Sequence, residues 1–244
     1  MSHALRVALC CSAIATAATL GGCGGASSNQ KHQGHPPNNG PVLVAALGDS
    51  ITAGNPGYDP NPRARAALGF GHDPRSQYEY WAHRDEPRLR FRNCGVYGQP
   101  TSQIATRLPS CARGADVLIV QGGINDIAQS LQGPAALRRL AVTNAATNIG
   151  RMVQQGKQLG LRVALANVLP WNHGYPVAAP LIDRLNRLIH TTAELEQVQV
   201  LPFNQTLASA KNPNLMKRRL TADGDHPSIA GYRRLGALVA KRLG

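Results

Sequence analysis

Short apolar runs alternate with longer amphipathic segments from residue 42 to the end of the chain. The apolar runs have the length of β-strands, and they predict strands at Val42–Leu47, Leu89–Asn93 (the weakest run), Ala115–Gln121, Arg162–Ala166 and Gln197–Leu201. The amphipathic segments predict helices at Gln77–Arg84, Ser102–Leu108, Ala135–Leu159, Leu181–Leu195 and Ser228–Leu243. This alternation indicates an α/β fold in which a parallel sheet of about five strands carries helices on both faces.

The first 40 residues differ in composition from the rest of the chain. The apolar stretch Val7–Leu20 has the length of a signal-peptide core and is too short to span a membrane. The sequence Leu20-Gly21-Gly22-Cys23 follows and resembles a bacterial lipobox, and the next residues have the glycine, serine, asparagine and proline content of a tether. We therefore predict a signal peptide at 1–22, a tether at 23–40 lipidated on Cys23, and one catalytic domain at 41–244.

Lipidation of Cys23 would anchor the exported protein to the bacterial cell envelope, in the periplasm or at the outer membrane. The alternative is an ordinary signal peptide whose cleavage site contains a cysteine, which would make the protein secreted. The predicted membrane contact is therefore the N-terminal lipid.

Two cysteines remain in the predicted domain, because Cys10 and Cys11 lie in the segment that would be removed and Cys23 would carry the lipid. In an oxidising compartment Cys94 and Cys111 suggest one disulfide, which would bracket Gly98; the alternative is two buried thiols.

Polar residues follow four of the predicted elements. They are Gly48-Asp49-Ser50, the stretch 93–98, Gly122-Gly123-Ile124-Asn125-Asp126 and Asp223-Gly224-Asp225-His226-Pro227. In a doubly wound sheet such loops lie at the same edge, so we expect these groups to converge there.

Acyl transfer is the chemistry that these groups suit. Ser50 needs a base to take its proton, and His226 is suited to this role because histidine is the side chain that commonly exchanges protons near neutral pH. Asp223, three residues earlier, can hold the imidazole in the required tautomer, with Asp225 as its rival. A turn or helix-capping role for Ser50 is the simpler alternative.

Hydrogen-bond donors for a tetrahedral oxyanion are also present. The candidates are the backbone N–H groups of Ser50 and Gly98 and the side-chain amide of Asn125. Asp49 and Asp126, beside them, are expected to brace the turns and loops.

These four motifs together resemble the SGNH (GDSL) hydrolase family. The resemblance rests on the blocks Gly48–Thr52, Gly98, Gly123–Asp126 and Asp223–Pro227, which appear in order over nearly the whole domain. It implies a flavodoxin-like three-layer α/β/α sandwich and serine hydrolysis of esters or thioesters without a metal or other cofactor. It also implies the catalytic and oxyanion roles given above.

The sequence does not identify the ester substrate or the acceptor of the acyl group. The expected substrate is a small-molecule, lipid or carbohydrate ester. The alternatives are a carbohydrate O-deacetylase, an acyltransferase that uses an acceptor other than water, and an envelope-binding lipoprotein that has lost catalysis. The breaker-rich segment Ala53–Ser76 is expected to wall the site. Trp171, His173 and Tyr175 are candidates for its rim, and the alternative is that they belong to a packed loop.

The chain carries 26 Lys and Arg residues against 13 Asp and Glu residues, a formal net charge of +13. The cations do not form a nucleic-acid-binding signature and aromatic residues are 5% of the chain, so we expect a solvated basic surface, no nucleic-acid partner, and a monomer. The run Lys217-Arg218-Arg219 precedes Asp223 closely enough to suggest attraction of an anionic substrate such as a phospholipid headgroup. The histidines lack zinc-ligand spacing.

Overall fold

A computed structural model describes residues 40–54 and 73–244 of the chain. The predicted signal peptide, nearly all of the tether, and Cys23 lie outside these ranges. So does most of the segment Ala53–Ser76 that we expected to wall the site.

Five strands form one parallel sheet, as predicted. They are β1 (Val42–Gly48), β2 (Leu89–Gly95), β3 (Val117–Val120), β4 (Arg162–Ala166) and β5 (Gln199–Leu201). Their order across the sheet is β2-β1-β3-β4-β5, which is the flavodoxin-like arrangement. The segment Leu89–Asn93, the weakest strand signal, pairs with β1 along its full length and extends to Gly95.

The helices that cover the sheet lie close to the predicted ranges. They are α1 (Ser50–Ala53), α3 (Tyr78–Asp85), α4 (Thr101–Thr106), α5 (Leu108–Cys111), α6 (Ile124–Ser130), α7 (Ala135–Gln158), α8 (Ala179–Glu196), α9 (Phe203–Leu207) and α10 (Ile229–Leu243), with short 3₁₀ turns at Pro74–Ser76 and Arg218–Leu220. The sequence pattern did not predict α1 and α6, and for α9 it indicated only a short helical piece after the last strand, because helices of four to seven residues are too short to show an amphipathic period.

The predicted helix Ser102–Leu108 is instead two helices, α4 and α5, that meet at Arg107. Pro109 explains the break, because a proline has no N–H to continue the hydrogen-bond ladder of α4. Arg107 therefore closes the first helix and precedes the second, at a bend in the chain.

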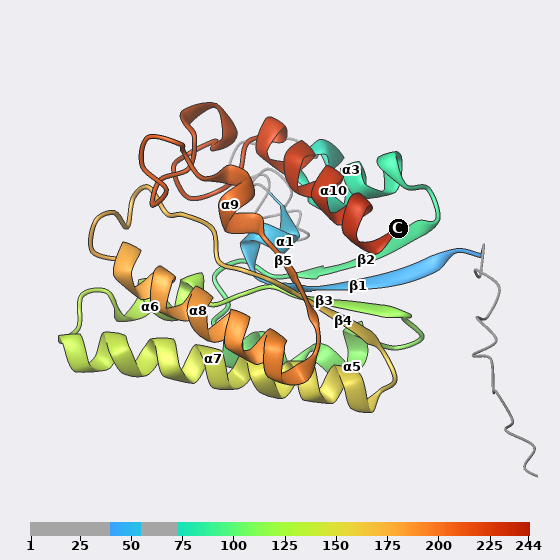
Figure 1. Ribbon diagram of the computed structural model, residues 1–244, viewed down its shortest axis with the longest axis horizontal. Coiled ribbons are helices and arrows are strands. Elements are labelled where there is room, and N and C mark those ends of the chain that lie inside the picture. Colours follow the sequence, from blue (N-terminus) through green and yellow to red (C-terminus); the bar gives the residue numbers. More distant parts are fainter. Residues whose placement is uncertain (1–39, 55–72) are drawn as a thin grey trace, which may run out of the picture. The chain divides into compact units, whose positions relative to one another are not determined.

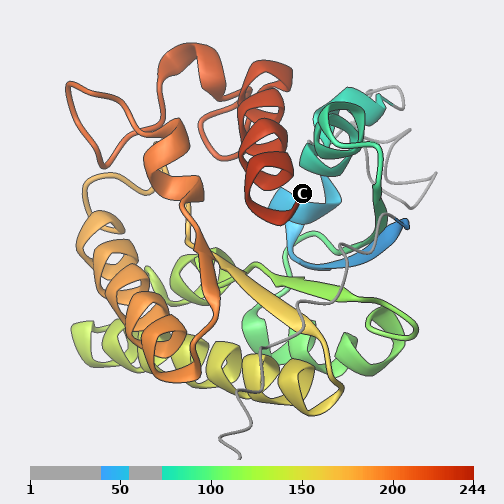
Figure 2. The same ribbon diagram turned by 45° about the vertical axis from the view of Figure 1, so that its right-hand side comes forward.

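The sheet has a separate apolar core on each face. Successive residues of β1 point to opposite sides, so Val44 and Ala46 pack in the core under α3, α9 and α10, whereas Ala45 and Leu47 pack in the core against α4 to α8. Figures 1 and 2 show α3 and α10 on one side of the sheet and α7 and α8 on the other. The result is the predicted three-layer α/β/α sandwich.

The connections leaving the carboxyl ends of β1 and β3 run to opposite faces of the sheet (Figure 1). Open α/β sheets bind their ligands at such a switch point. Ser50 follows β1 and Asn125 begins a helix after β3, so both lie at this edge. Within the described residues, no helix is both long and apolar enough to cross a membrane.

Candidate active site

Ser50 is the first residue of α1, in a tight turn immediately after β1. Gln121, at the end of β3, fixes this turn: its Oε1 accepts from the backbone N of Asp49 (3.2 Å) and from Thr52 Oγ1 (2.9 Å). Only glycine fits at position 48, because an added Cβ would lie 2.2 Å from Thr52 Oγ1. The turn thus holds Ser50 rigidly, with 6% of its surface exposed.

His226 lies between Ser50 and Asp223. Its Nε2 is 3.1 Å from Ser50 Oγ, and its Nδ1 is 2.8 Å from Asp223 Oδ2. Because an ionised carboxylate can only accept, the fitting neutral tautomer carries its proton on Nδ1, and Nε2 accepts from the serine hydroxyl. The structure therefore brings together the three residues that the sequence singled out for acyl transfer.

The loop 221–227 presents Asp223 and His226 in a fixed relation. An antiparallel bridge between Thr221 and Pro227 closes the loop. Inside it, the backbone N–H groups of His226 and Asp225 donate to Asp223 Oδ1 at 2.7 and 2.9 Å, which leaves Oδ2 for the imidazole. Partial burial alone would raise the pKa of Asp223, but the hydrogen bonds from the His226 ring and from these two N–H groups lower it well below its ordinary value. Asp223 is therefore an anion at neutral pH.

The rival acid, Asp225, belongs to a different set of contacts. Its Oδ1 accepts from Trp171 Nε1 at 2.6 Å and lies 2.8 Å from His173 Nδ1. Asn172 N also donates to Gly224 O at 3.0 Å, so the loop after β4 is tied to the loop that carries His226. Trp171 and His173 thus contact the loop that carries His226 through Asp225, and Trp171 also packs against one apolar core, whereas Tyr175 is exposed. Tyr97 adds a further ring, whose centroid is 6.3 Å from that of His226.

The three candidate oxyanion donors sit on three loops at the same edge. Gly98 has φ +72°, a backbone conformation that favours glycine, and its carbonyl accepts from Gln129 Nε2 at 3.1 Å. Asn125 Nδ2 donates to Gln99 O at 3.1 Å, which links its loop to the Gly98 loop and leaves a second amide hydrogen for a ligand. Among the described residues, the backbone N–H groups of Ser50 and Gly98 have no acceptor.

Asp49 and Asp126 brace the site, as expected. Asp49 Oδ1 accepts from Ile51 N at 2.9 Å, and Asp126 accepts from both the backbone N and the hydroxyl of Thr101 at 2.9 and 2.7 Å. Asp49 is fully buried and its Oδ2 has no hydrogen-bond partner. Burial is the main cause that raises the pKa of Asp49 to about 6.

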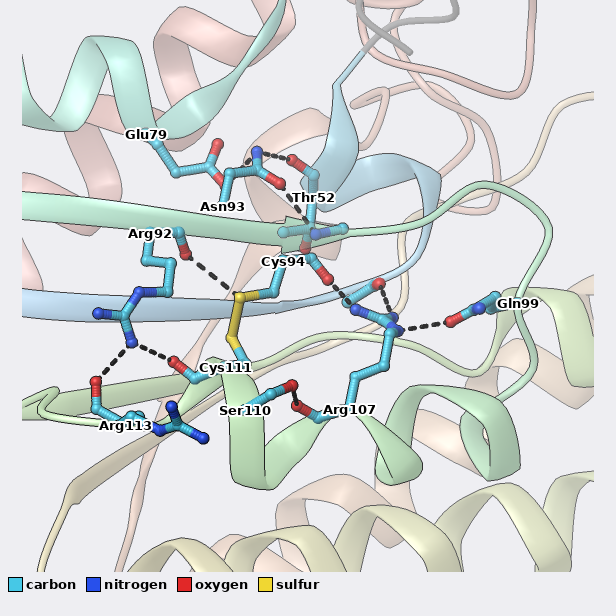
Figure 3. The surroundings of a disulfide bond; sticks show 12 residues. Thr52, Glu79, Arg92, Asn93, Cys94, Gln99, Arg107, Ser110, Cys111 and Arg113 are labelled. Atoms are coloured by element: carbon cyan, nitrogen blue, oxygen red, sulfur yellow. Dashed lines mark hydrogen bonds between the residues drawn. A yellow bond between two sulfur atoms is a disulfide. The ribbon is translucent and has the colours of Figure 1, made fainter. Parts of the chain in front are cut away.

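Cys94 and Cys111 form a disulfide that brackets Gly98 in the sequence (Figure 3). It joins the end of β2 to the end of α5, so the residues between them form a closed loop of the chain. Within residues 40–54 and 73–244, no three potential metal-ligating side chains lie together.

The basic run Lys217-Arg218-Arg219 lies at the foot of the loop that carries His226. Ser228 Oγ donates to Arg219 O at 2.9 Å where that loop returns to α10. Arg219, Arg233 and Arg234 line a groove of about 420 Å³. Of the ion pairs among the described residues, none involves these cations, so no carboxylate is paired directly with them.

The fold and site define a class of protein, in which a flavodoxin-like sheet presents a hydrogen-bonded serine, histidine and aspartate at its carboxyl edge. The chain belongs to the GDSL-like lipase/acylhydrolase family, whose sequence profile matches residues 46–234. This is a family of ester hydrolases, and it agrees with the resemblance carried by the four motifs. No curated protein matches the sequence.

Solved structures share the fold. One is a lipolytic protein of the G-D-S-L family from Desulfitobacterium hafniense, with 20% identity, a TM-score of 0.64, and coverage of 82% of this chain and 98% of that one. A second, also of the G-D-S-L family, is from Veillonella parvula, with 16% identity, a TM-score of 0.63, and coverage of 82% and 97%. A third is a variant of an acetyl xylan esterase from Geobacillus stearothermophilus, with 18% identity, a TM-score of 0.61, and coverage of 84% and 96%.

Sequence reasoning missed the supporting residues of the site. Gln121 ends an apolar run, and that position was the only signal that it faces the site edge. Arg107 and Gln99 carried no signal, because their contacts join residues that are close in space and not in any sequence motif.

The buried carboxyl of Asp49 gives a prediction for stability against pH. A carboxyl whose pKa is about 6 when folded and 3.8 as a model compound favours folding most below pH 3.8, and this contribution is lost as the pH rises through 6. Asp49→Asn keeps an acceptor for Ile51 N and removes the charge. From about pH 4 to about pH 7.5, the unfolding free energy of the wild type should fall relative to that of the variant by up to about 3 kcal/mol, at about 1.36 kcal/mol per pKa unit. Urea unfolding at both pH values measures this difference, and parallel pH dependence of the two proteins would contradict it.

Proposed function

We propose that this protein is a serine ester hydrolase that works through an acyl-enzyme on Ser50. The observation that carries the proposal is the unbroken line of hydrogen bonds from Ser50 Oγ through His226 to Asp223, with distances of 3.1 and 2.8 Å. Membership of the GDSL-like family supports the same reaction class.

In the proposed reaction, Ser50 Oγ attacks the carbonyl carbon of the ester while its proton passes to His226 Nε2. Asp223, an anion held by two backbone N–H groups, stabilises the imidazolium that forms. The imidazolium then gives its proton to the alcohol oxygen as the ester C–O bond breaks, which leaves the acyl group on Ser50. Water repeats the two steps and releases the acid.

The carbonyl oxygen becomes an oxyanion during each attack, and we assign its stabilisation to Ser50 N, Gly98 N and Asn125 Nδ2. The absence of a described acceptor for the two backbone N–H groups supports this role. Such donors are typically worth about 3 kcal/mol each in the transition state, because they are fixed before the charge develops.

Removal of the nucleophile should abolish turnover and leave the fold intact. We expect Ser50→Ala to lower kcat by at least about 10³-fold with little change in melting temperature, since a triad acts as a unit. Ser209→Ala, in the loop after α9, is the matched control and should keep wild-type activity. A fluorophosphonate probe should label the wild type and Ser209→Ala but not Ser50→Ala.

The substrate range of the purified protein separates this function from its alternatives. We propose to compare p-nitrophenyl esters of graded length, lysophospholipids and acetylated sugars, with and without alcohol acceptors. A preference for acetylated sugars would favour an O-deacetylase, and transfer to an alcohol would favour an acyltransferase. Retained esterase activity in Ser50→Ala would refute the assignment of the nucleophile, and a wild type that neither turns over nor takes the probe would indicate a binding protein.

For the substrate, we propose a preference for esters that carry an anionic group, such as lysophospholipids. The cations beside the loop 221–227, which form no ion pair within the described residues, support it, because a patch of one charge raises the local concentration of opposite charges. Arg218→Glu with Arg219→Glu should raise KM for an anionic ester by at least about threefold at low salt and reduce its salt dependence. The control pair Arg139→Glu with Arg187→Glu makes the same change in net charge as the first pair, but at positions on α7 and α8. An equal effect of the first pair on neutral esters would argue against the preference.

We also propose that the protein is exported and anchored to the cell envelope by a lipid on Cys23. The lipobox-like sequence and the tether-like composition after it support this location. Cys23→Ala should move the protein from the membrane fraction to the soluble fraction, and the intact mass of the wild type should include the lipid. A mature N-terminus at another residue, without added mass, would indicate simple secretion.

A further inference from the structure

Arg107 donates hydrogen bonds to three separate parts of the chain, from the bend between α4 and α5. Its Nη2 donates to Gly48 O at 2.9 Å, its Nε to Gln99 Oε1 at 2.8 Å, and its Nη1 to Cys94 O (Figure 3). All three acceptors are neutral oxygens, and the side chain is half-buried. Only a guanidinium has enough donors in a planar fork to satisfy three acceptors in different directions.

Each acceptor lies in a loop that carries a proposed oxyanion donor, or at the end of the strand that leads into one. Gly48 ends β1, two residues before Ser50. Gln99 follows Gly98, and its backbone carbonyl accepts from Asn125 Nδ2 at 3.1 Å. One side chain therefore contacts the Ser50 loop and the Gly98 loop directly, and it reaches Asn125 through Gln99.

The third acceptor connects Arg107 to the disulfide. Cys94 and Cys111 are 17 residues apart in sequence, and the loop they close contains both Gly98 and Arg107. The bond from Arg107 to Cys94 O ties the two ends of this loop together beside the disulfide, and the bond from Arg107 to Gln99 holds the residue that follows Gly98.

The charge and the burial of Arg107 are consistent with a role in holding the loops of the site. Burial lowers the pKa of Arg107, and the nearby carboxyl of Asp49 opposes that effect. Arg107 forms no ion pair with any residue in the ranges 40–54 and 73–244. Desolvation makes a half-buried cation with neutral partners less favourable in free energy than an exposed one. The cost indicates that the contacts of Arg107 serve the arrangement of the loops it joins.

We propose that Arg107 is a positioning residue that sets the Gly98 and Asn125 donors in register with Ser50, with the Cys94–Cys111 disulfide holding the same loop closed. This inference rests on the proposed function, since it concerns the oxyanion donors of that reaction. It predicts loss of transition-state stabilisation without loss of substrate binding.

Arg92 offers a matched control. Arg92 Nη1 donates to Cys111 O at 2.8 Å and to Arg113 O at 2.6 Å, so it too binds two backbone carbonyls beside the disulfide (Figure 3). Neither acceptor lies on the loops of Ser50, Gly98 or Asn125. Arg92→Ala therefore tests general stabilisation of the disulfide region, and Arg107→Ala tests the positioning role.

The experiment compares kcat, KM and melting temperature for Arg107→Ala, Arg107→Lys and Arg92→Ala on one ester. Arg107→Ala should lower kcat by about 10- to 100-fold while KM changes by less than about twofold, because a displacement of about 1 Å costs that much. Arg107→Lys keeps the charge but not the fork, and it should recover only part of kcat. Added guanidinium at a few millimolar, well below denaturing concentrations, should restore activity to Arg107→Ala and not to Arg92→Ala.

Disulfide reduction supplies an independent measurement. Reduction should lower kcat of the wild type by a few-fold, since Arg107 still spans the loop, and it should lower kcat of Arg107→Lys by a larger factor. Equal factors would mean that the disulfide and Arg107 do not act on the same loop.

Two results would overturn the proposal: equal kcat losses in Arg107→Ala and Arg92→Ala, or a raised KM with kcat unchanged. Should Arg107→Ala not fold, Arg107→Lys and Gln99→Ala carry the test, because Gln99→Ala removes one acceptor and leaves the arginine in place. The proposed function is tested separately, by fluorophosphonate labelling of Ser50 in every folded variant. If Arg107 proved dispensable but Ser50 were still labelled, the positioning role would be wrong and the assignment of Ser50 as the nucleophile would stand.

Discussion

The structure depends on the pairing of backbone polar groups where β1 ends. The chain turns sharply there into α1, inside a region from which water is largely excluded, so an N–H or C=O without a partner is costly, and the N–H of Ser50 is the exception that we assign to the oxyanion. Gly48 O accepts from Val96 N and from Arg107, and the N–H of Asp49 donates to Gln121. These partners come from β2, the α4–α5 bend and β3, and they bring to one point the loops that carry the site.

The same edge of the sheet holds polar groups that are costly to bury. Glu79 is buried against Asn93, whose Nδ2 donates to Glu79 Oε1 at 3.0 Å and to Thr52 O at 2.6 Å (Figure 3). Burial raises the pKa of Glu79 far above its ordinary value, so the neutral carboxyl is favoured, and its Oε2 has no partner. Together with Asp49, this carboxyl makes the region behind α1 polar, in contrast to the apolar cores on either face of the sheet.

The two carboxylates near the serine show how environment separates their roles. Asp223 is partly exposed and accepts three hydrogen bonds, which keep it ionised beside His226. Asp49 is fully buried and accepts one from Ile51 N, so its neutral form is favoured over a wider pH range. The chain thus places one carboxylate that stays ionised against the imidazole, and it buries a second carboxyl beside the nucleophile, where the charge is disfavoured below about pH 6.

The sequence by itself determined the layers of the fold and which polar residues meet at one edge of the sheet. Strand-length apolar runs and amphipathic helices are local patterns, and parallel strands bring their carboxyl ends to one edge whatever the details of packing, so Ser50, Asn125 and His226 could be placed together in advance. The spacing of three residues also favoured Asp223 over Asp225 as the partner of the imidazole. Only the tertiary structure decided that Asp225 accepts from Trp171, that α4 ends at Arg107, and that Gln121 and Arg107 hold the loops in place. These outcomes depend on hydrogen bonds between residues up to 72 positions apart, whose directions are set by how the layers pack and leave no period or motif in the chain.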